Sequence, residues 1–201
     1  MASDFHCHRR KGGCRSLLSC EIPEGLCSFQ AHPWTADRPL TIPDISRFAA
    51  IGETGLDWYK GASRESQLLR FRQMLELAER ENKSIVIHCV RAWEELFSIR
   101  RQFPDQRWLI HGFRGAPELL EQLRRAGFWV SLGRSGIERL LYPGFSLHRI
   151  GFETDDGEAS IHELFGIASE RLQLPREDIE RITDWNFEEF LCLNDSNAPG
   201  F

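Results

Sequence analysis

Long hydrophobic runs are missing from this 201-residue sequence, and the stretch Met1–Gly13 carries histidine and basic residues instead of an apolar segment. A membrane-spanning helix needs about 20 consecutive apolar residues, and a secretory signal needs an apolar stretch near its start. These absences predict a cytoplasmic protein with no membrane partner.

Closely spaced cysteine pairs are absent, and lysine is scarce. The six cysteines include no C-x-x-C motif, and a chain of this size does not need a disulfide scaffold, so we expect buried reduced thiols. Only Lys11, Lys60 and Lys83 are lysines, so most of the 25 basic residues are arginines. Arginine suits bidentate contacts with phosphate.

Positive charge is not in excess, because the formal net charge is -5. This balance argues against a protein that coats nucleic acid by bulk electrostatic attraction. It leaves a nuclease open, since bound divalent cations neutralise an acidic site locally.

Short apolar runs alternate with amphipathic stretches along the chain. We expect strands at 16–22, 25–31, 48–52, 84–88, 107–111, 128–132 and 149–154, after a first strand that ends at the H-x-H of residues 6–8. We expect helices at 63–82, 92–103, 116–126, 135–141, 160–172 and 176–193. Alternation of strands and helices at this spacing predicts βαβ units and a parallel sheet.

About seven or eight such strands, with helices after most of the later ones, predict an α/β fold: a TIM-like (β/α) barrel, slightly abbreviated, formed by residues 1–201 as one domain. An open doubly wound sheet is the alternative. The sequence contains no G-x-G-x-x-G or Walker-type loop that would favour a nucleotide-binding version of that sheet.

Residues with metal affinity follow the apolar runs. They are His6, His8, Glu53, His88, His111 and Asp155. The carboxyl ends of barrel strands meet at one rim, where active sites are built, and side chains two residues apart share a strand face. Four imidazoles and two carboxylates at one rim suit a binuclear site, in which a carboxylate bridges two cations about 3.5–4 Å apart.

Five segments together resemble the TatD-type metal-dependent hydrolases, in that family's order. They are F-H-C-H at 5–8, A-I-G-E-T-G-L-D-W-Y at 50–59, S-I-V-I-H-C-V-R at 84–91, W-L-I-H-G-F at 108–113 and G-F-E-T-D at 151–155. Q-A-H-P-W at 30–34 and Asn186 match further family positions. The resemblance implies a TIM-like barrel with its metal site at the C-terminal ends of the strands. It also implies divalent-metal-dependent hydrolysis of nucleic acid phosphodiesters.

The resemblance implies a role for each candidate residue. His6, His8 and Asp155 would bind one cation, His88 and His111 would bind a second, and Glu53 would bridge the two. Asp155 would also orient the attacking water or accept its proton, so Glu53 and Asp155 are the catalytic candidates. Mg²⁺ or Mn²⁺ is the expected metal, with Zn²⁺ or another transition metal as the alternative.

Other residues are expected to support the metal ligands or bind substrate. Asp57 would orient a ligand, His32 lies near the site in such folds without being an expected ligand, and Arg91 and Arg114 would grip phosphate. Exposed aromatic side chains near the rim would bind unstacked bases. The candidates are Trp34, Trp58, Tyr59 and Trp93.

The chain departs from the family pattern around the site. It is shorter than typical members, and the segment after E-T-D passes almost directly into the helix at Ser160. Arg9, Arg10 and Lys11 follow the H-x-H in place of the usual acidic residue, and Ser84 replaces the usual proline. We expect a more open site that accepts a strand end or single-stranded nucleic acid.

An exonuclease is the leading interpretation, and an endonuclease at abasic sites is the second. A hydrolase of a non-nucleic ester or amide stays open because folds do not fix substrates, although no lysine stands at a strand end to bridge metals as in some amidohydrolases. Short relatives also occur in bacterial antiphage systems. A nuclease subunit with protein partners, or a non-catalytic subunit, therefore stays open as well, and nothing in the sequence specifies an oligomeric state.

Overall fold

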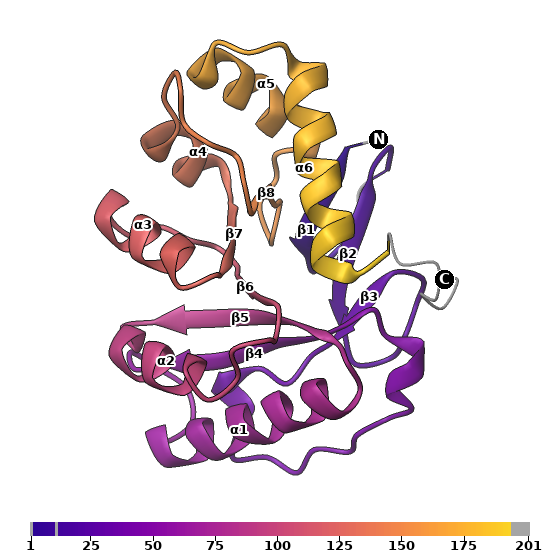
Figure 1. The fold of residues 1–201 in the computed structure, drawn as a ribbon. Coiled ribbons are helices and arrows are strands. Elements are labelled where there is room, and N and C mark those ends of the chain that lie inside the picture. The colour runs from indigo at the N-terminus through magenta and orange to yellow at the C-terminus, as the bar shows by residue number, and fades with distance from the viewer. Residues whose placement is uncertain (1, 11, 194–201) are drawn as a thin grey trace. The chain divides into compact units, whose positions relative to one another are not determined.

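The computed structural model describes residues 2–10 and 12–193, and its eight parallel strands follow one another across one sheet in chain order (Figure 1). The strands are β1 (Ser3–Cys7), β2 (Arg15–Cys20), β3 (Cys27–Phe29), β4 (Ala50–Asp57), β5 (Ser84–Val90), β6 (Trp108–Ile110), β7 (Trp129–Leu132) and β8 (Ile150–Phe152). The helices are η1 (Pro33–Thr35), η2 (Ile45–Arg47), α1 (Arg64–Arg80), α2 (Trp93–Arg100), α3 (Pro117–Arg125), α4 (Arg134–Leu140), α5 (Ile161–Leu172) and α6 (Arg176–Leu191), of which η1 and η2 are 3-10 helices.

The strand order is that of a TIM-like (β/α) barrel, which confirms the predicted fold class. An open doubly wound sheet would reverse its strand order at a switch point, and the eight described strands show no reversal. The segments at the ends of β1 and β8 meet, because the Asp155 backbone N–H donates to the His6 carbonyl oxygen at 3.0 Å. Helices follow each strand from β4 onward, whereas loops and 3-10 helices join β1 to β4, so the barrel is abbreviated in its first part.

The chain divides into two compact units. Unit 1 comprises the described residues of Met1–Leu18 and His111–Phe201, and unit 2 comprises Ser19–Ile110. Each unit contains its own group of histidines and carboxylates, so the chemistry of each is described within that unit. The expectation of a single domain over residues 1–201 stays a prediction.

In unit 2, β4 and β5 approach each other closely at two glycines. Gly52 and Gly55 have φ angles of +119° and +138°, and a Cβ atom there would lie 2.2 Å from the Val86 carbonyl oxygen and 2.1 Å from that of His88. A residue with a side chain has no room in such an approach, and glycine alone adopts these φ angles readily. The two glycines of G-E-T-G therefore allow β4 to pair with β5 on both sides of Glu53.

The positions of two ligand candidates along their strands differ from the prediction. Glu53 lies inside β4, whereas the sequence predicted that it would follow a strand ending at residue 52. His88 was predicted as the last residue of its strand, but β5 continues to Val90. The reason for Glu53 is a slip in the β4–β5 register between Ile51 and Thr54. A bulge of this kind re-aims a side chain without ending the strand.

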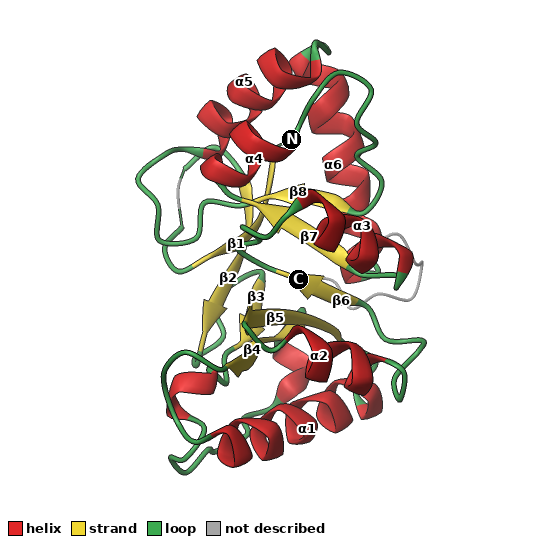
Figure 2. Ribbon diagram, turned by 90° about the vertical axis from the view of Figure 1, so that its left-hand side faces the viewer, coloured by secondary structure: helices red, strands yellow, loops and turns green. Residues whose placement is uncertain are grey.

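Helix α1 of unit 2 begins where its capping residues predict. The Ser63 hydroxyl accepts a hydrogen bond from the Ser66 backbone N–H at 3.1 Å, which satisfies one free donor of the first turn. Phe71, Met74 and Leu75 are fully buried and recur at helical spacing. The helix packs on β4, and Figure 2 shows α1 and α2 along the same side of β4 and β5.

In unit 1, α5 packs against α6, and α6 packs against β1 and β8. Ser160 and Glu163 form a capping box at the start of α5. Asn186 of α6 is buried, and its amide donates to the carbonyl oxygens of Leu147 and Ile150 at 2.7 and 2.8 Å. Asn186 therefore ties α6 to the start of β8, which gives it a structural role.

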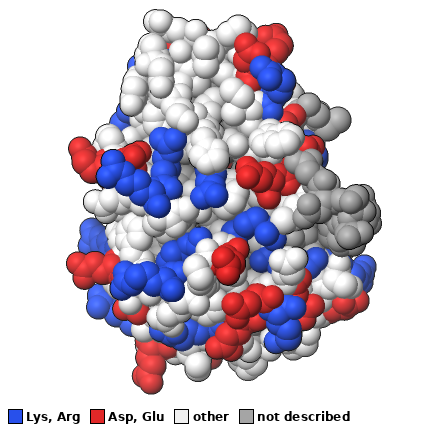
Figure 3. Space-filling view, viewed as in Figure 1, with Lys and Arg blue, Asp and Glu red and all other residues white. Residues whose placement is uncertain are grey.

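All the predicted helices are present, with ends shifted by three residues or fewer. Within residues 2–10 and 12–193, no helix combines the length and apolar character that crossing a bilayer requires. The six cysteines are free thiols, as predicted, but only Cys7 and Cys27 are buried, and the other four are partly exposed. On the face drawn in Figure 3, Lys and Arg side chains lie interspersed with Asp and Glu.

Candidate metal centre

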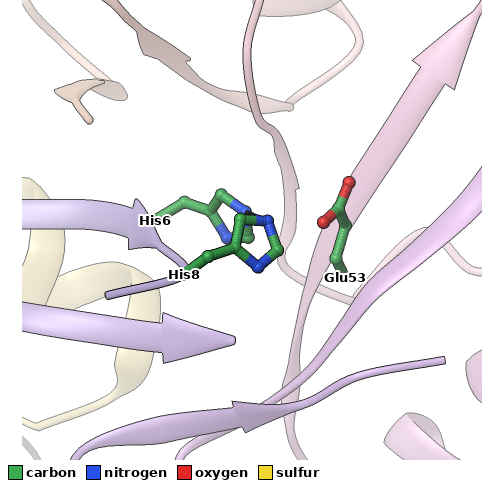
Figure 4. A group of neighbouring side chains, drawn as sticks. All are labelled: His6, His8 and Glu53. Atoms are coloured by element: carbon green, nitrogen blue, oxygen red, sulfur yellow. Dashed lines mark hydrogen bonds between the residues drawn. The ribbon is translucent and has the colours of Figure 1, made fainter. Parts of the chain in front are cut away.

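Unit 1 brings four of the predicted ligands together: His6, His8, His111 and Asp155. His6 Nε2 lies 3.3 Å from His8 Nε2 and 3.8 Å from Asp155 Oδ1, and His8 Nε2 lies 3.6 Å from the same oxygen. The ring centroids of His6 and His111 are 4.3 Å apart. One donor atom each of His6, His111 and Asp155 lies within 4.8 Å of the others. Figure 4 shows the two rings of the H-x-H close together at the end of β1.

The backbone fixes both ends of this group. The β1–β2 register slips between Asp4 and Cys7, where His6 lies. Asp155 has a left-handed φ of 48°, which aspartate tolerates better than most residues. Thr154 donates from its N–H and its hydroxyl to the two carboxylate oxygens of Asp4, at 3.0 and 2.7 Å. Strand β1 therefore holds the segment that carries Asp155.

Glu153 belongs to this group, although the sequence analysis did not single it out. Its side chain is 1% exposed, its carboxylate accepts hydrogen bonds from the Gly112 N–H and the Ser131 hydroxyl, and Oε1 lies 3.7 Å from His111 Nδ1. Burial opposes ionisation, but the electrostatic attraction of His111 and of His6, together with the hydrogen bond from the Ser131 hydroxyl, lowers the pKa of Glu153. A carboxylate in this position fixes the orientation of a ligand histidine.

Unit 2 contains a second group, formed by His32, Glu53 and His88. Glu53 Oε1 lies 3.1 Å from His32 Nε2 and 2.9 Å from His88 Nδ1. One donor atom of each residue lies within 4.8 Å of the others, and the Glu53 side chain is 3% exposed. Figure 4 draws the Glu53 carboxylate projecting from β4. The sequence analysis did not expect His32 to be a ligand. Its Nε2 lies about as close to Glu53 Oε1 as His88 Nδ1 does, so His32 belongs to this group of donors.

Asp57, which was expected to orient a metal ligand, lies beside His88. Its Oδ2 lies 3.3 Å from His88 Nε2 and accepts a 2.7 Å hydrogen bond from Trp34 Nε1, and its Oδ1 accepts the backbone N–H groups of Tyr59 and Lys60. Burial opposes ionisation of this carboxyl, but these hydrogen bonds outweigh it and lower the pKa of Asp57. His88 thus has Asp57 as its neighbouring carboxylate, just as His111 has Glu153.

The two expected phosphate-binding arginines lie beside different ligand groups. Arg114 is exposed and lines a cleft of about 630 Å³ in unit 1, whose walls also include Arg134, Glu153, Asp155 and Asp156. In unit 2, Arg91 is exposed on the turn after β5. Of the aromatic candidates, Tyr59 is 70% and Trp34 40% exposed, whereas Trp58 and Trp93 are half-buried.

Comparison with known proteins identifies the family. Residues 21–191 match the family described as TatD related DNase. The sequence is 24% identical over 194 residues to the human protein "Deoxyribonuclease TATDN3", covering 87% of this chain and 71% of that protein. It is 30% identical over 165 residues to the "3'-5' ssDNA/RNA exonuclease TatD" of Erwinia billingiae, covering 73% of this chain and 59% of the relative. The chain thus spans less than two thirds of the Erwinia protein's length.

The crystal structure of YJJV, a TatD homologue from Escherichia coli K12, has the same fold. It superposes with a TM-score of 0.74 at 17% identity, over 94% of this chain and 97% of that one. Because the family match extends over most of the sequence and this fold is shared, the chain belongs to the TatD-related DNase family.

Proposed function

We propose that this chain is a divalent-metal-dependent hydrolase that cleaves phosphodiester bonds in single-stranded nucleic acid, acting as an exonuclease. The observation that carries the proposal is the presence in each unit of a compact group of histidine and carboxylate donors. Family membership supports the reaction class, and the printed activities of the relatives, on DNA and on single-stranded DNA or RNA, support the substrate class.

The donor chemistry of both groups fits divalent cations. Imidazole nitrogens suit transition ions, and carboxylate oxygens also suit Mg²⁺ and Mn²⁺. We propose two cations, one bound in unit 1 by His6, His8, His111 and Asp155, and one bound in unit 2 by Glu53 and His88. The family resemblance assigned His111 to the second cation, whereas His111 lies beside His6 in unit 1, so experiment has to decide which cation His111 serves.

The bound cations would lower the pKa of water and neutralise charge that develops on the phosphoryl group. Side chains of the protein would accept the proton, bind the phosphate and orient the ligand histidines. The Asp155 side chain is 30% exposed and lines the cleft of unit 1, so it orients the attacking water and accepts its proton. Arg114 lines the same cleft, where its guanidinium contacts a phosphate. Asp57 and Glu153 hold the rings of His88 and His111 in place.

Cleavage of end-labelled single-stranded DNA tests this proposal. Purified protein is incubated with Mg²⁺, Mn²⁺ or EDTA, with substrates labelled at either end so that the direction of shortening is visible. We expect metal-dependent shortening by the wild type and a loss of at least about 100-fold in Glu53→Ala, the scale on which a group that stabilises the transition state acts. Glu76→Ala, which changes an exposed glutamate of α1, is the matched control and should retain activity.

Two results would contradict the proposal. Folded, metal-loaded wild-type protein that leaves every labelled strand intact would indicate a non-nucleic substrate or a required protein partner. Internal cuts at abasic sites without shortening of intact strands would replace the exonuclease with an endonuclease.

A further inference from the structure

Three aromatic side chains of unit 2 each have a cationic side chain over the ring. Lys60 Nζ lies 3.4 Å from the centroid of the Trp34 ring, and the guanidinium carbons of Arg91 and Arg64 lie 5.3 and 5.0 Å from the centroids of Tyr59 and Trp58. We call these six residues the aromatic–cation surface. Arginine or lysine over an aromatic face is a recurrent cation–π arrangement.

This surface adjoins the ligand group of unit 2. Trp34 donates from Nε1 to Asp57, and its ring meets those of His32 and His88 edge to face, with centroids 4.5 and 5.9 Å away. Tyr59 lies two residues after Asp57, the last residue of β4, and donates its N–H to that carboxylate. The surface therefore begins at the residues that hold His88.

Gly61 allows the surface to form, because the chain passes very close to Trp34 there. A Cβ atom on Gly61 would lie 2.6 Å from Trp34 Cα, and its φ of +97° belongs to the region that glycine adopts most easily. The hydrogen bond from Trp34 Nε1 to Asp57 also holds the indole. Trp34 is thus a fixed support, whereas Tyr59, at 70% exposure, is open to solvent.

The charge of the surface is uncompensated. Within residues 2–10 and 12–193, no carboxylate forms an ion pair with Lys60, Arg64 or Arg91. All three cations are exposed, in a chain whose net charge is -5. Exposed cations that adjoin open aromatic rings are the combination that binds the phosphates and base faces of single strands.

We propose that the aromatic–cation surface binds unpaired nucleotides, with a base stacked on Tyr59 and phosphates contacted by Arg91 and Lys60. This inference rests on the proposed function for its substrate class and adds the residues that select single strands. In a duplex the base faces are already stacked, so an aromatic ring gains no stacking partner unless the strand is opened. The preference for single strands would therefore reside in Tyr59 and the cations beside it.

Equilibrium binding in EDTA tests the surface separately from catalysis. The probe is a fluorescent oligothymidine of about 12 nucleotides, within the usual footprint of such sites, and the full chain is titrated by fluorescence anisotropy. We expect Tyr59→Ala to weaken binding by about 5- to 150-fold, the effect of losing one base–aromatic stack. Tyr59→Phe keeps the ring and should bind within about twofold of the wild type. Trp185→Ala changes another exposed aromatic residue, on α6, and should bind like the wild type.

Salt dependence separates phosphate contacts from stacking. For single strands, each lost phosphate contact reduces the slope of log affinity against log salt by about 0.7. We expect Arg91→Ala to reduce the slope by about that amount, and Tyr59→Ala to leave the slope unchanged while lowering affinity at every salt concentration. Arg80→Ala, at an exposed arginine of α1, is the control and should leave both quantities unchanged.

The outcomes distinguish this inference from the proposed function. Absence of wild-type binding in EDTA would overturn the inference, because the surface contains no metal ligand. Wild-type affinity in Tyr59→Ala, with circular dichroism showing a folded protein, would also overturn it, even if the wild type cleaves DNA with metal. Binding that is lost in Tyr59→Ala and kept in Tyr59→Phe would uphold it, even if no metal supports cleavage.

Discussion

Asp57→Asn is the change that most directly tests how His88 is held. The carboxylate accepts four hydrogen bonds: from Trp34 Nε1, from the N–H groups of Tyr59 and Lys60, and from His88 Nε2. Asparagine has one acceptor oxygen in place of two. If that oxygen keeps the two backbone donors, the amide NH₂ faces the indole N–H and the imidazole, and donors meet donors.

The magnitude follows from the hydrogen bonds that are lost. Hydrogen bonds to a charged group contribute about 1.5–3 kcal/mol each, and a buried donor left without an acceptor costs about 1–3 kcal/mol. Because two side-chain donors are affected, we expect Asp57→Asn to lower the free energy of unfolding by about 2–4 kcal/mol. Trp34→Phe removes one of these donors and should cost about 2 kcal/mol alone.

A double-mutant cycle isolates the contact between Asp57 and Trp34. The free energy of unfolding is measured by urea denaturation in EDTA, followed by circular dichroism, for both single variants and the double variant. Once Asp57 is asparagine, removing the indole N–H relieves a clash of donors, so the double variant should be more stable than additivity predicts by about 1–2 kcal/mol. Trp185→Phe, at an exposed position, should change stability by less than about 0.5 kcal/mol. Additivity within about 0.5 kcal/mol would refute the reasoning.

Three further predictions concern the scaffold. Gly55→Ala should destabilise the protein severely, because the added Cβ would lie 2.1 Å from the His88 carbonyl oxygen. In the control Gly166→Ala in α5, the added Cβ meets nothing within 4 Å, so the free energy of unfolding should rise by about 0.5–1 kcal/mol; thermal unfolding of both variants measures the difference. Asn186→Ala should lower the unfolding free energy by about 2–4 kcal/mol, since two buried carbonyl oxygens lose their donor, and it should leave KM unchanged; an altered KM with normal stability would contradict the structural role. Burial raises the pKa of Asp4 to about 7, so without metal the folded protein binds this proton more tightly than the unfolded chain does. The free energy of unfolding, measured by urea titration in EDTA, should therefore fall as pH rises from about 4 to 7. Asp4→Asn should abolish that part of the pH dependence.

The fold was predictable because its signal is periodic and local. Alternating apolar runs and amphipathic stretches specify parallel strands joined by helices, and caps such as Ser63 and Ser160 mark where helices begin. The interior positions of Glu53 and His88 within their strands were not predictable in this way. The bulge before Thr54 and the close approach at Gly52 are defined by the partner strand, and a sequence contains no local mark of that partner.

Glu153 shows a signal that was present in the sequence and was not used. It stands two residues before Asp155, and residues at that spacing share a strand face, so a buried position beside the other ligands could have been inferred from E-T-D alone. The role of Trp34 differs, because its indole meets Asp57 across 23 positions of sequence. Trp34 was expected as a stacking candidate and is exposed, but its fixed position depends on this tertiary contact, which the sequence does not indicate.

The two ligand groups lead to a prediction about metal stoichiometry. Each group is complete within one compact unit, so each should bind a cation by its own donors. Asp4, Glu153 and Asp155 gather in unit 1, and a bound cation offsets the repulsion among such carboxylates. Metal should therefore stabilise the folded state, by about 2.7 kcal/mol at 100 times the Kd.

Calorimetric titration with Mn²⁺ should resolve two binding events in the wild type. Removing an imidazole from one group weakens that group and leaves the donors of the other intact. His111→Ala should thus retain the event of unit 2, and His88→Ala should retain the event of unit 1, each with about half the wild-type stoichiometry. If either substitution abolished all binding, the groups would not act as separate cation sites. If both variants kept the full stoichiometry, neither histidine would be a required ligand. Because His111 stands with His6 and Asp155, its variant is the one that decides which cation it serves.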